Sequence, residues 1–151
     1  QCAAIEFTRN VLGLQDAHTT EIDKATKNPV INLMEEQKKV TDLGGSMRLG
    51  LYDCHIDSNS LTFEQYEKSD IQERHRHRYE FNNDYREQFN DHGMKVAGVN
   101  PKEDLVEIIE LVDHPWFIGV QFHPEYKSTV KEPHPLFTGF VKAAINHKKD
   151  K

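Results

Sequence analysis

The chain has 151 residues, which is enough for one domain or a large part of one, and its formal net charge is −6 at pH 7. That acidic balance argues against a nucleic-acid or anionic-membrane surface. No apolar run approaches the roughly 18 residues of a membrane span, no signal peptide is present, and two cysteines are too few for a disulfide framework, so we expect a cytoplasmic protein with reduced thiols.

The first part of the chain predicts one helix, a polar loop and two extended segments. Residues 1–14 carry apolar side chains at helical spacing, with one buried face. Residues 16–28 are polar and contain turn-forming residues, which predicts a loop. Residues 30–34 favour a short extended segment. The loose alternation of residues 43–56, after a glycine pair, predicts a strand.

The middle of the chain predicts a short helix and then an unusual strand. Residues 60–68 favour a helix with Ser60 as its N-cap. Residues 71–81 favour a strand on which cationic side chains alternate with imidazoles, namely Arg74, Arg76 and Arg78 with His75 and His77. Paired histidines suggest a metal site, but no third ligand follows at ligand spacing, and zinc needs three or four ligands. We therefore predict no metal.

The last part of the chain predicts a strand meander between two helices. Residues 82–92 favour a polar helix that ends at a glycine. Three strands with short turns between them are expected at residues 95–99, 105–112 and 116–122. Residues 133–148 favour a final helix with an apolar face and a lysine-rich end.

A histidine and a carboxylate follow the third strand of this meander. His123 and Glu125 lie two residues apart, so extended backbone points both to one face, and Pro124 between them stiffens the pair. An imidazole held beside a carboxylate has a set tautomer and a stabilised imidazolium, as the general base of a nucleophile requires. The alternative interpretation is a surface turn with a chance ion pair.

Four motifs identify a family. QFHPE at residues 121–125 is the His/Glu signature of class I glutamine amidotransferases, which use a Cys-His-Glu triad. Together with DLGGSMRLG, ERHRHRYEFNN and LVEIIE, in this order along the chain, it resembles the C-terminal amidotransferase domain of the CTP synthase family. The resemblance implies an α/β, flavodoxin-like fold with a mostly parallel sheet, of which residues 1–151 are the C-terminal part only.

The resemblance also assigns residue roles for glutamine hydrolysis. His123 is the implied general base and then acid, and Glu125 is its orienting partner. Glu21 and Arg78 match the residues that bind the α-ammonium and α-carboxylate of glutamine, and a guanidinium suits a carboxylate because it binds both oxygens. Gln1 would help line the pocket.

Two further positions match residues that the family links to the response to GTP, which acts as an allosteric activator. They are Ser46 and Arg48. Without the resemblance, these would be a turn hydroxyl and a solvated arginine.

The resemblance places the nucleophile outside this sequence. Gln1 matches the last residue of a CLGMQ-like run, so the cysteine would lie just upstream of residue 1, and Cys2 would be a packed helix residue. We therefore expect the chain alone to be inactive. Its implied partners are glutamine and an N-terminal synthetase domain that uses ATP and Mg²⁺ to aminate UTP, within a homotetramer. The alternatives are another class I amidotransferase and a regulatory relative without catalysis.

Overall fold

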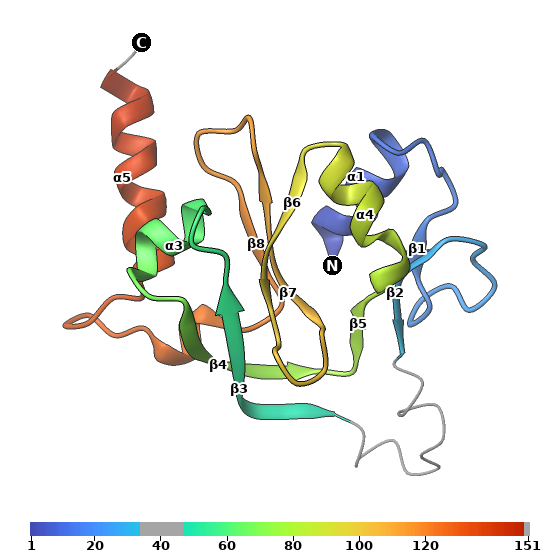
Figure 1. Cartoon of the computed structure of the whole chain (residues 1–151), viewed down its shortest axis with the longest axis horizontal. Helices are drawn as coiled ribbons and strands as arrows, with labels where there is room; N and C mark the ends of the chain where they lie inside the picture. The colour runs from blue at the N-terminus through green and yellow to red at the C-terminus, as the bar shows by residue number, and fades with distance from the viewer. Residues whose placement is uncertain (34–46, 150–151) are drawn as a thin grey trace.

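The computed structural model describes residues 1–33 and 47–149, which form two sheets side by side (Figure 1). The smaller sheet has the order β1-β2-β5, from strands His18–Thr19, Pro29–Leu33 and Tyr79–Phe81. The larger sheet has the order β4-β3-β6-β7-β8. Its strands, in chain order, are Arg48–Ile56 (β3), Asp70–His77 (β4), Met94–Val99 (β6), Val106–Leu111 (β7) and Ile118–Val120 (β8).

The expected strand meander is confirmed, but the prediction of a mostly parallel sheet is wrong for the described strands. Every pairing in the larger sheet is antiparallel, and only β1 and β2 pair in parallel. The reason is the length of the connections. Short turns join β6 to β7 and β7 to β8, whereas a parallel pair needs a long crossover.

The strand predicted over residues 71–81 is two strands. The chain leaves β4 after His77, bends at Arg78 and enters the other sheet as β5. The predicted alternation holds within β4, where Glu73 and His75 are buried while Arg74 and Arg76 are exposed. It ends at the bend, so Arg78 does not continue that cationic face.

Two apolar cores lie on the two sheets. The core of the smaller sheet contains Phe7 of helix α1 (Cys2–Asn10) and Phe89 of helix α4 (Arg86–Asp91), whose rings lie 4.9 Å apart. A 3₁₀ turn, η1 (Asn83–Tyr85), precedes α4, so the helix predicted over residues 82–92 is shorter and less regular.

The core of the larger sheet is covered by helices α3 (Leu61–Tyr66) and α5 (Pro135–Lys149). Ser60 caps α3 as predicted, because its side chain accepts a hydrogen bond from the Phe63 N–H. A Cβ at Gly139 of α5 would lie 2.3 Å from both Gln65 and Trp116, so glycine permits this close packing.

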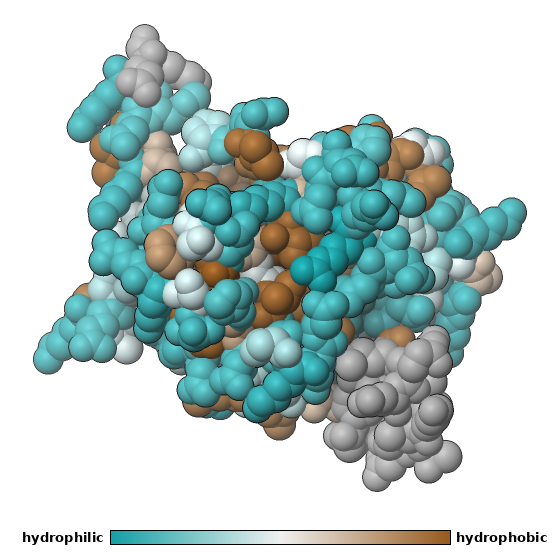
Figure 2. Space-filling view, in the orientation of Figure 1, coloured by the Kyte–Doolittle hydropathy of each residue, from teal (hydrophilic) through white to brown (hydrophobic). Residues whose placement is uncertain are grey.

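Hydrophobic residues gather near the middle of the face shown in Figure 2, over β7 and β8. An apolar hollow there takes side chains from both sheets, including Ile31, Phe81 and Ile109. No helix in the described part of the chain is long and apolar enough to cross a membrane.

Candidate functional site

A cleft of about 460 Å³ brings together four predicted site residues from separate parts of the chain, namely Gln1, Glu21, Arg78 and His123. Gln1 immediately precedes α1, Glu21 follows β1, Arg78 lies at the bend between β4 and β5, and His123 follows β8. These side chains meet in one place because the chain passes from the larger sheet to the smaller sheet beside the cleft. The other lining residues are Met47, Arg76, His77, Tyr79, Val120 and Gln121.

His123 and Glu125 form a hydrogen-bonded pair at the end of the cleft. His123 Nδ1 lies 2.8 Å from Glu125 Oε1, which leaves Nε2 for a second partner. The backbone N–H of Glu125 and the hydrogen bond to His123 hold the pKa of the Glu125 carboxyl below its usual range. The pair is partly exposed, with side-chain exposures of 36% and 55%. This geometry suits an imidazole base oriented by an ionised carboxylate.

The backbone fixes where His123 lies. Its N–H donates a hydrogen bond of 2.9 Å to the Arg74 carbonyl on β4. The 3₁₀ turn η2 (Pro124–Lys127) begins directly after it, and Pro124 occupies the first turn, where its missing N–H costs little. The Tyr126 ring stacks on the imidazole with a centroid distance of 4.9 Å. The histidine is therefore held by β4, by its own turn and by an aromatic ring.

The three arginines of the β4–β5 region have different surroundings. Arg78 lines the cleft, is half-buried, and has a buried Nε without a hydrogen-bond partner among the described residues. Arg76 also lines the cleft but is exposed, whereas Arg74 is exposed and is not a lining residue. Arg78 thus has the most enclosed guanidinium of the three.

Two glutamine side chains converge on one carbonyl beside Arg78. Gln1 Nε2 and Gln121 Nε2 donate hydrogen bonds of 3.3 and 3.1 Å to the Tyr79 carbonyl oxygen. These bonds tie the start of α1 and the end of β8 to the bend that carries Arg78. Glu21 is exposed on its loop, and its N–H donates to Thr19 Oγ1 at 3.2 Å.

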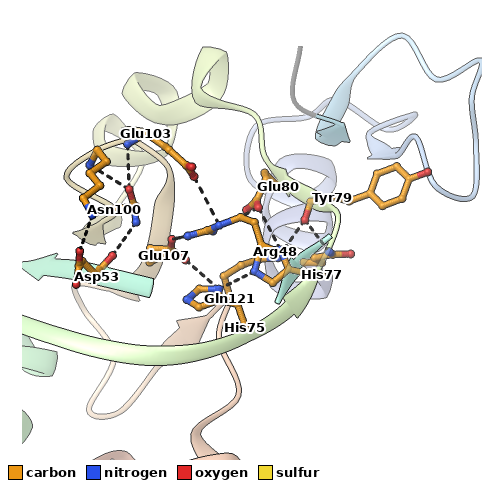
Figure 3. Close-up of polar contacts among 12 residues, drawn as sticks. Arg48, Asp53, His75, His77, Tyr79, Glu80, Asn100, Glu103, Glu107 and Gln121 are labelled. Atoms are coloured by element: carbon orange, nitrogen blue, oxygen red, sulfur yellow. Dashed lines mark hydrogen bonds and ion pairs between the residues drawn. The ribbon is translucent and has the colours of Figure 1, made fainter. Parts of the chain in front are cut away.

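Arg48 is buried in an ion-pair cluster rather than solvated. Its Nη2 lies 2.7 Å from Glu107 Oε1, its Nη1 lies 3.3 Å from Glu80 Oε1, and its Nε lies 3.6 Å from Glu103 Oε2 (Figure 3). Burial disfavours the charged guanidinium, but these carboxylates more than offset it and raise the Arg48 pKa. Arg48 therefore links β3 and β7 of the larger sheet to β5 of the smaller one. Ser46 lies outside the described residues.

The prediction of no metal considered only spacing along the chain, and it stays a prediction. In the fold, His75, His77 and Glu107 each offer one ligand atom, and these atoms lie within 4.8 Å of one another. Sequence spacing missed Glu107 because it enters from β7. A signal was nevertheless present, since a carboxylate inside the apolar run LVEIIE needs a buried partner.

Sequence reasoning also missed Gln121, Tyr79 and His77 as cleft residues. Gln121 precedes His123 by two residues, so extended backbone carries both side chains to one face. That spacing could have identified it. The contribution of Tyr79 is its backbone carbonyl, which no side-chain pattern indicates.

Neither cysteine lines this cleft. Cys2 lies in helix α1 as predicted, but the prediction that it is packed is wrong, because it is exposed at the first position of the helix; Cys54 is buried in β3. Burial, followed by the nearby Glu107 and Glu73 carboxylates, raises the pKa of the Cys54 thiol far above its usual range. A buried thiol of that kind is inert, because the thiolate is the nucleophile. Among the described residues, the cleft therefore contains His123, with Glu125 beside it, but no thiol.

Comparison with known proteins gives a consistent result. The family model described as glutamine amidotransferase class-I matches residues 1–143. The chain is 60% identical to the CTP synthase of Bacteroides fragilis over 146 residues, and 61% identical to that of Cytophaga hutchinsonii over 151 residues. These matches cover 97% and 100% of the chain but only 27% and 28% of the relatives.

A solved structure is similar over nearly the whole chain. It is the Trypanosoma brucei CTPS glutaminase domain with bound acivicin, at 34% identity and a TM-score of 0.88. The match covers 97% of this chain and 57% of that one.

Proposed function

Because the chain belongs to the class I glutamine amidotransferase family, we propose that its cleft binds and hydrolyses glutamine as part of a CTP synthase. The relatives that support this proposal are CTP synthases, of which the chain spans 27–28%. The observation that carries it is the convergence in one cleft of Glu21, Arg78 and the His123–Glu125 pair.

The cleft offers complementary groups for an amino acid. The Arg78 guanidinium would bind the α-carboxylate through two oxygens, and Glu21 would accept hydrogen bonds from the α-ammonium. The Gln1 and Gln121 amides hold the Tyr79 carbonyl, and with it the backbone beside Arg78. The side-chain amide of the substrate would then extend toward His123.

The His123–Glu125 pair would move the protons of the reaction. With Nδ1 held by Glu125, His123 would accept the proton of a cysteine thiol at Nε2. The thiolate would attack the substrate amide carbon, and the imidazolium would return the proton to the departing nitrogen, which releases ammonia and forms a thioester. His123 would next deprotonate the water that hydrolyses the thioester to glutamate. We place this cysteine and the oxyanion-hole donor upstream of residue 1.

We assign the second half-reaction to a separate synthetase domain. There, ATP and Mg²⁺ would activate UTP for attack by the ammonia, and the product would be CTP. The sequence contains no Gly-Lys dipeptide and hence no G-x-x-x-x-G-K-[ST] phosphate loop, so the 151 residues do not fit an ATP site of that type. Assembly as a homotetramer in the cytoplasm is part of the same proposal.

The response to GTP would involve Arg48 indirectly. Three carboxylates already surround its guanidinium, which is almost fully buried. Arg48 would therefore act by holding β3, β5 and β7 together, and the proposal for Ser46 rests on the family resemblance alone.

The test is His123→Ala in the full-length enzyme, with CTP formation measured from glutamine and from free ammonia. Glutamine-dependent formation should be lost, whereas ammonia-dependent formation should be retained, because the two reactions occupy different domains. A parallel loss of both would make His123 structural and refute the assignment. A wild-type protein without glutamine hydrolysis would instead favour a regulatory relative, which the absence of a thiol among the described cleft residues also fits.

A further inference from the structure

We propose that His75, His77 and Glu107 form a binding site for a divalent transition-metal cation, best matched by Zn²⁺, between β4 and β7 beside the cleft (Figure 3). The two strands are not neighbours in the sheet, since β3 and β6 lie between them. The two histidines project from β4 toward the Glu107 carboxylate, so an ion there would join the outer strand to the interior of the sheet.

The donor atoms are nearly at coordination distances from one another. His75 Nδ1 lies 2.7 Å from His77 Nε2 and 3.7 Å from Glu107 Oε2. Ligand bonds of about 2.0–2.1 Å in a tetrahedral zinc site put neighbouring donors roughly 3.3 Å apart. The imidazoles would separate by about half an ångström and the Glu107 carboxylate would approach His75 by a similar amount. The distance from Glu107 to His77 is at most 4.8 Å, so that gap would also have to close through side-chain movement.

Two charged side chains lie next to the proposed ligands, in positions like those of residues that orient metal ligands in other proteins. Arg48 Nη2 holds the other oxygen of Glu107 at 2.7 Å. Glu80 Oε1 lies 3.2 Å from His77 Nδ1, on the far side of that imidazole ring. A carboxylate beside the second nitrogen of a ligating histidine fixes its tautomer and raises its basicity. Glu107 therefore already has an orienting hydrogen bond, whereas Glu80 lies near His77 Nδ1 without forming one in the described structure.

Burial and charge explain why a cation would be favoured here. The side chains of His75 and Glu107 are fully buried, and that of His77 is 9% exposed. Within the described structure, Glu107 Oε2 is buried and accepts no hydrogen bond, which is unusual for a buried oxygen. One guanidinium, from Arg48, faces three carboxylates, so the cluster keeps negative charge that a divalent cation would balance.

The donor set selects the class of metal. Two imidazoles and one carboxylate suit Zn²⁺ and its transition-metal neighbours, whereas Mg²⁺ and Ca²⁺ prefer oxygen ligands. His77 lines the cleft, so a fourth ligand could enter from that side.

The experiment is titration of the metal-free, full-length protein with Zn²⁺ by calorimetry and with Co²⁺ by visible absorption. This readout is metal binding and is therefore independent of glutamine hydrolysis. Wild type should bind one equivalent that His77→Ala and Glu107→Gln each weaken at least about tenfold. Glu107→Gln preserves shape and the hydrogen bond to Arg48. The bound Co²⁺ should show intense tetrahedral d–d bands.

Two variants serve as matched controls. His55→Ala removes an exposed histidine that pairs with Asp70, and Cys2→Ser removes the exposed thiol. Both should bind metal as wild type does. The proposal is overturned if no equivalent binds, if His77→Ala and Glu107→Gln bind normally, or if Cys2→Ser abolishes binding. Should the site variants not fold, the wild-type and Cys2→Ser Co²⁺ spectra decide the matter in the same way.

Discussion

Replacing Arg78 should impair glutamine use far more than replacing either neighbouring arginine. Arg78 lines the cleft from the bend between β4 and β5, is half-buried, and has a buried Nε. Arg76 lines the same cleft but is exposed, and Arg74 is exposed outside it. The alternation of residues along the chain does not distinguish the roles of the three arginines, whereas their burial and position in the fold do.

The expected magnitudes follow from these surroundings. Loss of a two-point contact from an enclosed guanidinium to a charged ligand costs on the order of 2–4 kcal/mol, or roughly 30- to 1000-fold in kcat/KM for glutamine. Loss of an exposed charge costs no more than about 1 kcal/mol, or roughly fivefold. We therefore expect Arg78→Ala to fall in the first range and Arg76→Ala in the second. Arg78→Lys should rescue poorly, because an ammonium cannot bind two oxygens side by side.

The assay is steady-state glutamine hydrolysis by the full-length enzyme, with ammonia-dependent CTP formation as the control for folding. Arg74→Ala is the matched control variant, because it removes an exposed charge while its backbone carbonyl still accepts the His123 N–H. Equal losses in all three alanine variants would refute the argument from enclosure. Full activity in Arg78→Lys would refute the two-point contact.

Three further predictions concern the chain itself. The purified 151 residues should release no ammonia from glutamine, because the cleft has a base but no thiol among its described residues; activity abolished by Cys2→Ser would contradict this. Arg48→Met should destabilise the fold by about 3–5 kcal/mol in urea unfolding, because it leaves buried Glu107 and Glu80 unpaired, whereas Lys102→Ala, at an exposed pair, should cost less than about 1 kcal/mol. Asp57→Asn should lower Tm at pH 7, because hydrogen bonds from Lys95 and the Asn59 N–H lower the Asp57 pKa. A lowered pKa stabilises above the unfolded value, so this difference should shrink as the pH falls below about 4, and a constant difference would exclude the ion pair.

Local chemistry was sufficient to predict most of the elements. Ser60 caps α3, and the strands near residues 95–120 form an antiparallel meander. Such features depend on residues that are close in sequence, so the pattern of side chains along the chain predicts them. The predicted class I glutamine amidotransferase fold is confirmed by the family match and by the similarity to the CTPS glutaminase domain. The His123–Glu125 hydrogen bond was also locally determined, since only Pro124 separates the two residues, although the contact forms across the start of the 3₁₀ turn η2 rather than along extended backbone.

Tertiary structure decided what lies between distant segments. Residues 71–81 divide into β4 and β5 because the two parts pair with strands of different sheets. The alternation of side chains along the chain does not indicate which sheet a strand joins. The burial of Arg48 likewise depends on carboxylates from β5 and β7.

The sequence by itself therefore determined the family, the hydrogen-bonded pair of His123 and Glu125 and most of the helices and strands, because each rests on residues close together in the chain. Only the fold decided that Arg78 is more enclosed than Arg76, and that Glu107 meets His75 and His77. Those contacts join residues about 30 positions apart or more, and the pairing of whole strands sets their distances.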